Sequence, residues 1–330
     1  MLILVDTMGA DNGIEQPVMA SKIFVNEFPE ARIALLGDAN KLSNLIASSQ
    51  NIQIIHAEEE ITCHDEPASS VRKKKKSSLV IGCKMLREGQ GDALISAGST
   101  GAILAASTLY VRRLKGIKRM ALAPILPSQH NCLLIDAGAN MDCKPEYLQQ
   151  FGLMGSIFME KIHNVENPRV GILNVGKEKE KGDTRTKEAY ELLSQSNINF
   201  IGNIEAREAL TTTADVLVCD GFSGNVLLKT IEGTASFAGK IFKDIIYRST
   251  FNKMAGLVLK KDLENFYLSM DASEAGGAPL LGADGCVIKI HGNSNERAFY
   301  CAMLKAMSFV SQNINEEFGR IIGASTVPQA

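Results

Sequence analysis

Residues 93–102 read ALISAGSTGA, a short apolar strand that runs directly into a turn of glycine and serine. Four other segments have the same form: ILVDTMGAD (3–11), LLIDAGANMD (133–142), GILNVGKEKEKGD (171–183) and VLVCDGFSGN (216–225). Such a turn at the carboxyl end of a parallel strand exposes backbone N–H groups, and the helix that follows adds its positive N-terminal end. Ligands of open α/β sheets bind in the crevice at that end. The five turns therefore predict a site for a sizeable polar or phosphorylated ligand at one sheet edge.

Strand and helix patterns alternate along nearly the whole chain. Apolar runs predict strands at 2–6, 31–37, 52–57, 93–96, 132–136, 169–174, 198–201, 215–219 and 287–290. Helical patterns lie between most of them, including segments near 14–28, 39–48 and 68–88. This alternation predicts a three-layer α/β/α sandwich with a largely parallel sheet covered on both faces. Since no linker or low-complexity tract divides residues 1–330, we expect a single domain.

Residues 226–268 form the longest stretch without a strand signal. Apolar side chains recur there at helical spacing, with basic side chains on the other face: Phe237, Ile241, Phe242, Ile245 and Ile246 against Lys240, Lys243 and Arg248. We predict a helical hairpin at about 237–268 that leaves the sandwich. A basic amphipathic hairpin can lie on an anionic membrane surface. An interface between subunits is the alternative, and the segment taken alone favours that alternative.

Composition narrows the class of protein. The 330 residues are 45% hydrophobic and carry a formal net charge of -2, which gives no general case for nucleic-acid binding. The seven cysteines include no C-x-x-C pair and no zinc-type spacing, so we expect buried free thiols. The chain begins with a strand, MLILVD, and no apolar run approaches the ~18 residues that span a bilayer. We therefore expect a cytosolic protein.

The sequence lacks the common catalytic signatures. It contains no G-x-S-x-G elbow, no Walker P-loop and no H-E-x-x-H, and the first turn is not the G-x-G-x-x-G of a nucleotide site. The five histidines are scattered and suggest no metal cluster. His291 is the one histidine that we single out, because it ends the strand VIKIHG at the same kind of strand terminus as the turns.

The turns are rich in hydrogen-bond donors and poor in nucleophiles, which suits a reaction whose nucleophile arrives as a substrate. Inorganic phosphate is such a nucleophile, and its attack on a thioester needs no serine or cysteine from the enzyme. The alternative for each turn is purely structural. The glycines then form tight turns, Ser99, Thr100 and Ser223 cap helices, and Asp6, Asp136 and Asp220 form Asx turns.

Long motifs of this chain closely resemble the PlsX family of acyl-ACP:phosphate acyltransferases. The resemblance extends to about residue 310 and rests on SAGSTGA (96–102), RMALAPILP (119–127), GANMDCKPEYLQQFGLMGS (138–156), PRVGILNVGKEKEKG (168–182), NFIGNIEAR (199–207), DGFSGNVLLKTIEG (220–233) and GGAPLLG (276–282). It implies a homodimeric α/β/α sandwich similar to the isocitrate/isopropylmalate dehydrogenase and phosphotransacetylase folds.

The resemblance also implies an activity. A long-chain acyl group passes from acyl carrier protein to inorganic phosphate, and the acyl phosphate feeds the first acylation of glycerol 3-phosphate in phospholipid synthesis. It implies peripheral membrane association through the hairpin, which strengthens the membrane interpretation, and a downstream glycerol-3-phosphate acyltransferase as a further partner. We expect no metal, no organic cofactor and no nucleic-acid partner.

Three departures from the family pattern stand out. Ala10 occupies a position where the family has glycine, Asp183-Thr184 replace the usual Asn-Glu after Gly182, and Ala275 replaces a tyrosine before Gly276-Gly277. These differences bear on the phosphate and acyl pockets more than on the reaction class.

We predict that phosphate binds among the N–H groups of turns 98–101 and 221–225, near Lys181. Asn140, Asn174 and Asn203 then position the thioester or its oxyanion, and His291 or an aspartate such as Asp220 manages protons. The predicted binding residues are Asp6, Gly9, Asp11, Gly98, Ser99, Thr100, Gly101, Asp142, Gly182, Gly221, Ser223, Gly224, Asn225, Gly276 and Gly277. Three other functions remain open: a phosphotransacetylase-like enzyme that uses acyl-CoA, a pyridine-nucleotide dehydrogenase, and a non-catalytic membrane scaffold or acyl-carrier-binding protein.

Overall fold

The computed structural model describes residues 1–46, 50–128, 130–270 and 276–325. One lobe is built on a seven-stranded sheet with the strand order β3-β2-β1-β4-β11-β10-β5. The strands β1 to β4 and β11 are parallel, whereas β10 is antiparallel to both of its neighbours. Their bounds are β1 (Leu2–Asp6), β2 (Arg32–Gly37), β3 (Ile52–His56), β4 (Ala93–Ser96), β5 (Ala121–Leu122), β10 (Ala278–Leu281) and β11 (Cys286–Lys289).

Alternation along the strands determines how helices cover this sheet. On β1, Ile3 and Val5 face one layer while Leu4 faces the other, as the period of two requires. The first layer holds α1 (Glu15–Glu27) and α10 (Glu296–Ser311), and α2 (Ala39–Leu45) packs beside β3. The second layer holds α3 (Pro67–Lys73), α4 (Ser78–Arg87), α5 (Thr100–Ala106) and η1 (Ser107–Val111). Both faces of the sheet are therefore buried.

The second lobe has a four-stranded parallel sheet with the order β6-β9-β7-β8. Its elements are β6 (Leu133–Ile135), α6 (Pro145–His163), β7 (Arg169–Asn174), α7 (Thr184–Ser194), β8 (Asn199–Glu205), η2 (Ala206–Glu208) and β9 (Val216–Val218). The five strand-to-turn junctions therefore do not share one sheet edge. Two of them follow β1 and β4 in the first sheet, and three follow β6, β7 and β9 in the second, so the prediction of a single edge is wrong.

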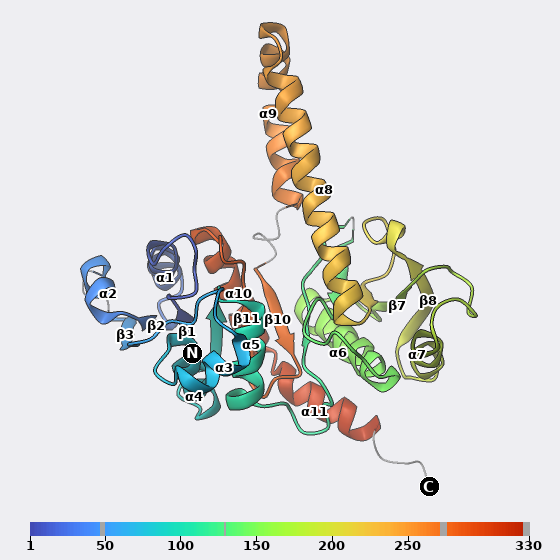
Figure 1. Ribbon diagram of the computed structural model, residues 1–330, viewed down its shortest axis with the longest axis horizontal. Coiled ribbons are helices and arrows are strands. Elements are labelled where there is room, and N and C mark those ends of the chain that lie inside the picture. The colour runs from blue at the N-terminus through green and yellow to red at the C-terminus, as the bar shows by residue number, and fades with distance from the viewer. Residues whose placement is uncertain (47–49, 129, 271–275, 326–330) are drawn as a thin grey trace.

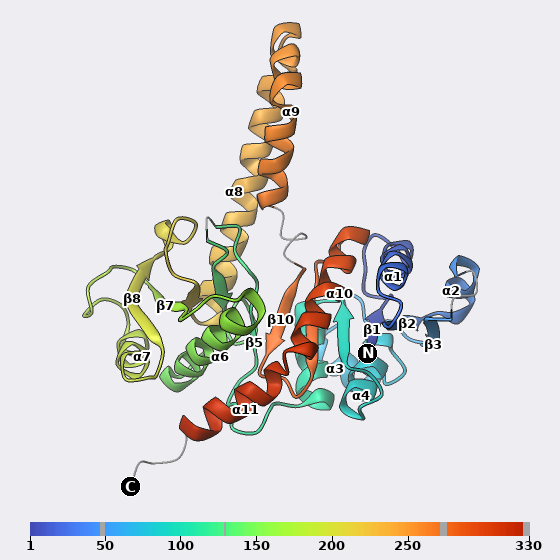
Figure 2. The same cartoon turned by 180° about the vertical axis from the view of Figure 1, so that it is seen from behind.

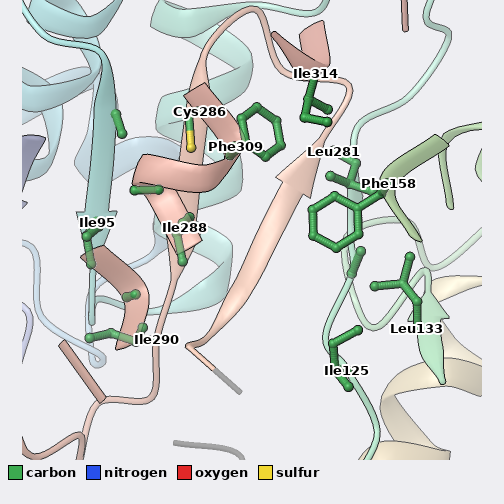
Figure 3. Close-up of a cluster of buried hydrophobic side chains, with 14 of the residues drawn as sticks. Ile95, Ile125, Leu133, Phe158, Leu281, Cys286, Ile288, Ile290, Phe309 and Ile314 are labelled. Carbon is green, nitrogen blue, oxygen red and sulfur yellow. The ribbon is translucent and has the colours of Figure 1, made fainter. Parts of the chain in front are cut away.

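A continuous cluster of buried side chains joins the lobes (Figure 3). Phe158 of α6 lies next to Leu281 of β10, and its ring centroid is 6.4 Å from that of Phe309 in α10. The helix α11 (Ile314–Ser325) extends from the first lobe and packs against α6 (Figure 2). The lobes thus share one hydrophobic core, and the single-domain organisation remains our prediction.

The predicted helical hairpin is present. It consists of α8 (Gly221–Tyr247) and α9 (Thr250–Met270), which project together away from both lobes (Figure 1). Asn252 Nδ2 donates to the Ile245 carbonyl at 2.8 Å and closes the turn between the helices. Gly256 lets them approach closely, because a Cβ there would lie 2.7 Å from the Ile246 side chain. Within the described ranges, no helix combines the length and apolarity needed to cross a bilayer.

Other local predictions differ in detail. The segment predicted as one helix near 68–88 is divided into α3 and α4, and the short antiparallel strands β5 and β10 were not predicted. All seven cysteines are free thiols, of which five are buried. The expectation of buried thiols is wrong for Cys63, which is exposed, and Cys301 is intermediate.

Candidate functional site

A cleft lies between the two lobes at the carboxyl ends of their parallel strands. It encloses about 100 Å³. The turn after β4 contributes Thr100, the turn after β6 contributes Ala137, and the first turns of α8 contribute Asn225. Most of the wall is apolar and comes from β5, the segment after it, and α8: Leu122, Pro124, Ile125, Pro127, Leu228, Ile231 and Ala235. The last part of the wall comes from the end of β11 and the segment that follows it, with Lys289, Ile290, His291 and Ser294. A cleft that is apolar with a few convergent polar groups has the usual character of a small-molecule site.

The turns after β1 and β4 are locked together. Asp6 is 2% exposed, and its carboxylate accepts hydrogen bonds from the hydroxyls of Ser78 and Ser96, both at 2.6 Å. Burial raises the pKa of Asp6, although these hydrogen bonds oppose the rise. A Cβ on Gly9 would lie 2.6 Å from the Gly98 nitrogen, so the two turns touch backbone to backbone. Asp6 and Gly9 thus support the site from behind and do not line the cleft.

The turn after β6 is organised by Asp136, which is fully buried. Its carboxylate accepts from four backbone N–H groups and from Asn140 Nδ2, at 2.6–3.2 Å. One of these donors is Leu122 of β5, so Asp136 ties the second lobe to the first. Burial raises the pKa of Asp136, and the hydrogen bonds from Ala139, Asn140 and Leu122 oppose the rise. Asn140 is held by this carboxylate and by the Met120 carbonyl, to which it donates at 2.7 Å. The side-chain NH2 group of Asn140 therefore forms hydrogen bonds within the protein.

Asp220 caps the start of α8. Its carboxylate accepts from the backbone N–H of Ser223 at 3.0 Å and from the Ser223 hydroxyl at 2.8 Å. Arg185 of α7 donates to the same carboxylate at 3.1 Å. The Gly221 N–H donates to the Asn140 carbonyl at 2.7 Å, which joins the turns after β6 and β9. Asp220 and Ser223 therefore have a structural role at the start of α8, which was the alternative interpretation of this turn.

Lys181, Asn174 and Asn203 lie elsewhere in the second lobe. The Lys181 side chain is exposed and does not line the cleft. Asn174 donates to the Lys181 carbonyl at 3.0 Å, and Asn203 donates to the Glu178 carbonyl at 2.7 Å. The two asparagines therefore hold the loop that follows β7. Lys181 thus lies outside this cleft, and the placement of phosphate near it stays a prediction.

Charged side chains gather on one wall of the cleft. Glu232 of α8 lies 2.7 Å from Lys229 Nζ and 3.4 Å from His291 Nε2. Burial by itself would raise the pKa of Glu232, but hydrogen bonds from His291 and Lys229 outweigh it and lower the pKa to about 2. Lys289 lies beside this group, and burial lowers its pKa to about 8. The wall therefore combines two lysines and a histidine with a single carboxylate, Glu232.

The predicted residues thus fall into two sets. Four of them line the cleft: Thr100, Asn225, Gly277 and His291. The others lie in the supporting turns, in the loop after β7, or nearby; Asp142 is exposed, and the Asp11 N–H donates to the Gly292 carbonyl at 2.7 Å. Lys289, Lys229, Glu232 and the apolar wall were missed. A lysine inside the apolar run CVIKI was the signal for Lys289, since a strand buried on both faces seldom carries a charge.

Two of the three departures from the family pattern have a local explanation. Ala10 is partly buried and packs against the hydrophobic core. Asp183 caps α7, where its carboxylate accepts from the backbone N–H of Thr186 at 2.7 Å and from the Thr186 hydroxyl at 2.6 Å. Ala275 lies outside the described residues.

Comparison with solved structures supports the fold class. A phosphotransacetylase from Streptococcus pyogenes has a TM-score of 0.65 at 16% identity, and the match covers 94% of each chain. A 4-hydroxythreonine-4-phosphate dehydrogenase from Klebsiella pneumoniae has a TM-score of 0.53 at 12% identity, covering 94% of this chain and 99% of the other. At such low identity these matches speak for the fold alone, and they confirm the predicted α/β/α class.

Comparison of sequences identifies the family. The model of a family described as "Fatty acid synthesis protein" matches residues 1–317. A phosphate acyltransferase of Oceanobacillus iheyensis is 46% identical over 312 residues, which cover 94% of each protein. One of Clostridium acetobutylicum is 44% identical over 325 residues, covering 97% of this chain and 98% of the relative. The chain therefore belongs to the fatty acid synthesis protein family, alongside these phosphate acyltransferases.

Proposed function

We propose that this chain transfers a long-chain acyl group from acyl carrier protein to inorganic phosphate, with the reacting groups in the cleft between the lobes. The observation that carries the proposal is the composition of the cleft, where an apolar wall adjoins a wall that bears two lysines and a histidine. An acyl chain suits the first wall and an anionic nucleophile suits the second. The acyl phosphate formed is a substrate for an acyltransferase that builds phospholipid.

Direct attack by phosphate is favoured because the buried cysteines are poor nucleophiles. Burial raises the pKa of Cys132 and Cys143 to about 12, and it raises that of Cys219 well above its usual range. These thiols stay protonated at neutral pH and react slowly. Within the described part of the chain, neither Thr100 nor Ser294 of the cleft has a histidine hydrogen-bonded to its hydroxyl. An activated serine or threonine is therefore not assembled there.

The proposed step balances without another reactant. An oxygen of hydrogen phosphate bonds to the thioester carbonyl carbon, the C–S bond breaks, and the proton of the phosphate ends on the departing thiol. The Asn225 side chain and the turn that carries Thr100 face the cleft from the two lobes, where they can donate to the developing oxyanion. His291 is exposed two residues after the end of β11, where it can relay the proton to the thiol.

The first prediction tests this reaction. The purified chain is supplied with phosphate and with acyl carrier protein that bears a long-chain acyl group. It is expected to release the carrier thiol and hydroxylamine-reactive acyl phosphate in equal amounts. No acyl group should remain bound to the protein, and EDTA should not reduce the rate. Equal or faster turnover of acyl-CoA would instead indicate a phosphotransacetylase-like enzyme. Reduction of NAD would indicate a dehydrogenase, and binding of the carrier without release of its thiol would indicate a scaffold.

We further propose that the chain is a homodimer that associates peripherally with membranes through its hairpin. The helices α8 and α9 expose large apolar side chains near their turn: Phe251, Leu257 and Val258 are 78%, 72% and 82% exposed. Lys253, Lys260 and Lys261 are also exposed there. An apolar surface flanked by lysines suits the interface of an anionic bilayer. Membrane contact would bring the acyl phosphate close to the acyltransferase that uses it.

The second prediction concerns this surface. Replacing both Leu257 and Val258 by aspartate is expected to reduce co-sedimentation with phosphatidylglycerol vesicles by about tenfold or more, because apolar burial is lost and anionic lipid repels the new charges. Val175→Asp is the matched control, since Val175 is 81% exposed on the loop after β7. If the hairpin variant binds vesicles normally but sediments as a smaller species, the hairpin is instead a subunit interface.

A further inference from the structure

Lys289 is the last residue of β11, and its neighbours along the chain are apolar. Its strand neighbours Ile288 and Ile290 are 0% and 2% exposed. In the sheet it pairs with Ser96 of β4 and with Ala278 of β10. The Lys289 side chain is mostly buried and lines the cleft between the lobes. A cation is thus placed at the carboxyl end of the first sheet, inside the cleft.

An ammonium group in such surroundings is costly unless an anion or several acceptors replace the lost water. Lys305 shows how this protein satisfies another buried lysine, since its Nζ donates to the Gly277 carbonyl at 2.8 Å. Lys289 has no equivalent: none of the residues that the structure describes forms a hydrogen bond or an ion pair with its Nζ. An anion that enters the cleft would supply the missing partner.

Four charged or titratable groups face Lys289 from the surrounding elements. They are Lys229 and Glu232 on α8, Asp11 in the turn after β1, and His291 two residues farther along the chain. The one carboxylate on the cleft wall, that of Glu232, is already engaged by Lys229 and His291. The Glu232 carboxylate therefore acts on the Lys289 charge only from a distance. A binding position for an anion remains beside Lys289 Nζ.

We propose that Lys289 Nζ is the cation that binds the inorganic phosphate nucleophile in this cleft. This inference rests on the proposed phosphate acyltransferase activity and names the residue that holds its nucleophile. The ammonium donates to one phosphate oxygen, and a second oxygen is left free to attack the thioester carbon. This assignment differs from the prediction from sequence, which placed phosphate near the exposed Lys181. The Lys289 side chain is a catalytic residue in this scheme because it touches the reacting phosphate.

The proposal predicts a pH dependence with a definite sign. With a pKa of about 8, which burial and Lys229 lower from the usual value, the ammonium is protonated at neutral pH and loses its charge above pH 8. The kcat/KM for phosphate should therefore fall as pH rises through about 8, since this ratio reports ionisations of the free enzyme. Phosphate itself is already largely dianionic in this range, because its second pKa is about 6–7.

Substitution at position 289 tests the assignment. Lys289→Met is expected to raise the KM for phosphate by about 100-fold, as when one partner of a buried charge pair is removed. The KM for the acyl donor should change by less than about threefold, because the acyl group contacts the apolar wall. Lys289→Arg should keep phosphate binding within about tenfold of the wild type and lose the decline above pH 8, since guanidinium stays protonated.

A binding measurement with inorganic phosphate alone separates this proposal from the activity. Calorimetric titration should show phosphate binding, and phosphate should raise the Tm, for the wild type and for the control variant Lys41→Met. Lys41 is an exposed lysine on α2. Both should be lost with Lys289→Met, whose Tm without phosphate should be no lower than that of the wild type. A phosphate KM within twofold of the wild type in a folded Lys289→Met protein would overturn the assignment. Absence of acyl phosphate formation by the wild type would overturn the proposed function itself.

Discussion

Replacing Asp136 by alanine is expected to lower the free energy of unfolding by about 4 kcal/mol, because five buried or partly buried donors lose their acceptor at once. The donors belong to Leu122 on β5 and to residues 138–140 in the turn after β6. The loss therefore falls on the junction between the lobes as well as on one turn. Urea unfolding monitored by circular dichroism measures it as a shift of the midpoint at unchanged slope.

Asp142→Ala is the matched control for this prediction. Asp142 lies in the same turn but is exposed, so its replacement should change stability by no more than about 0.5 kcal/mol. Asp136→Asn should resemble Asp136→Ala, because the NH2 group of the new side chain would face N–H donors that need an acceptor. Equal midpoints for Asp136→Ala and Asp142→Ala would show that the network does not hold the two lobes together.

The strands of this fold could be predicted well because each parallel strand is a short, continuous apolar run. The runs ending at Asp6, Gly37 and Asn174 match β1, β2 and β7 within one residue at either end. Their division between two sheets could not be predicted. Parallel pairing is decided by contacts between distant segments, and the two short antiparallel strands β5 and β10 carry no strong local signal.

The position of the cleft could be predicted more accurately than its chemistry. The strand-to-turn pattern selected Thr100 and Asn225, which line the cleft, although their role in binding stays a prediction. It also selected Asp6, Asn140 and Asn174, whose side chains turn out to hydrogen-bond to neighbouring side chains or backbone groups. A polar residue after a strand can bind a ligand or its own turn, and the sequence pattern is the same for both. Lys289 was not predicted because it lies within a strand, outside the strand-to-turn pattern.

The turn after β1 leads to the second large effect. Gly9→Ala is expected to destabilise the protein by about 3 kcal/mol, at the upper end for overpacking, because the obstacle is backbone that cannot rotate away. The new Cβ would lie 2.6 Å from the nitrogen and 2.7 Å from the Cα of Gly98. Relief of this overlap would displace the turn after β4, and with it Thr100, which lines the cleft. Activity should therefore fall together with the Tm.

Ala10→Gly provides the matched comparison one residue along the same turn. It restores the residue that the PlsX pattern has at this position, and it removes only a partly buried methyl group. The expected cost is about 0.4–1 kcal/mol, mainly from the greater freedom of glycine in the unfolded chain. Denaturant midpoints and initial rates of both variants measure the contrast. If Gly9→Ala is as stable and as active as Ala10→Gly, then close contact between the turns after β1 and β4 is not what holds the cleft in shape.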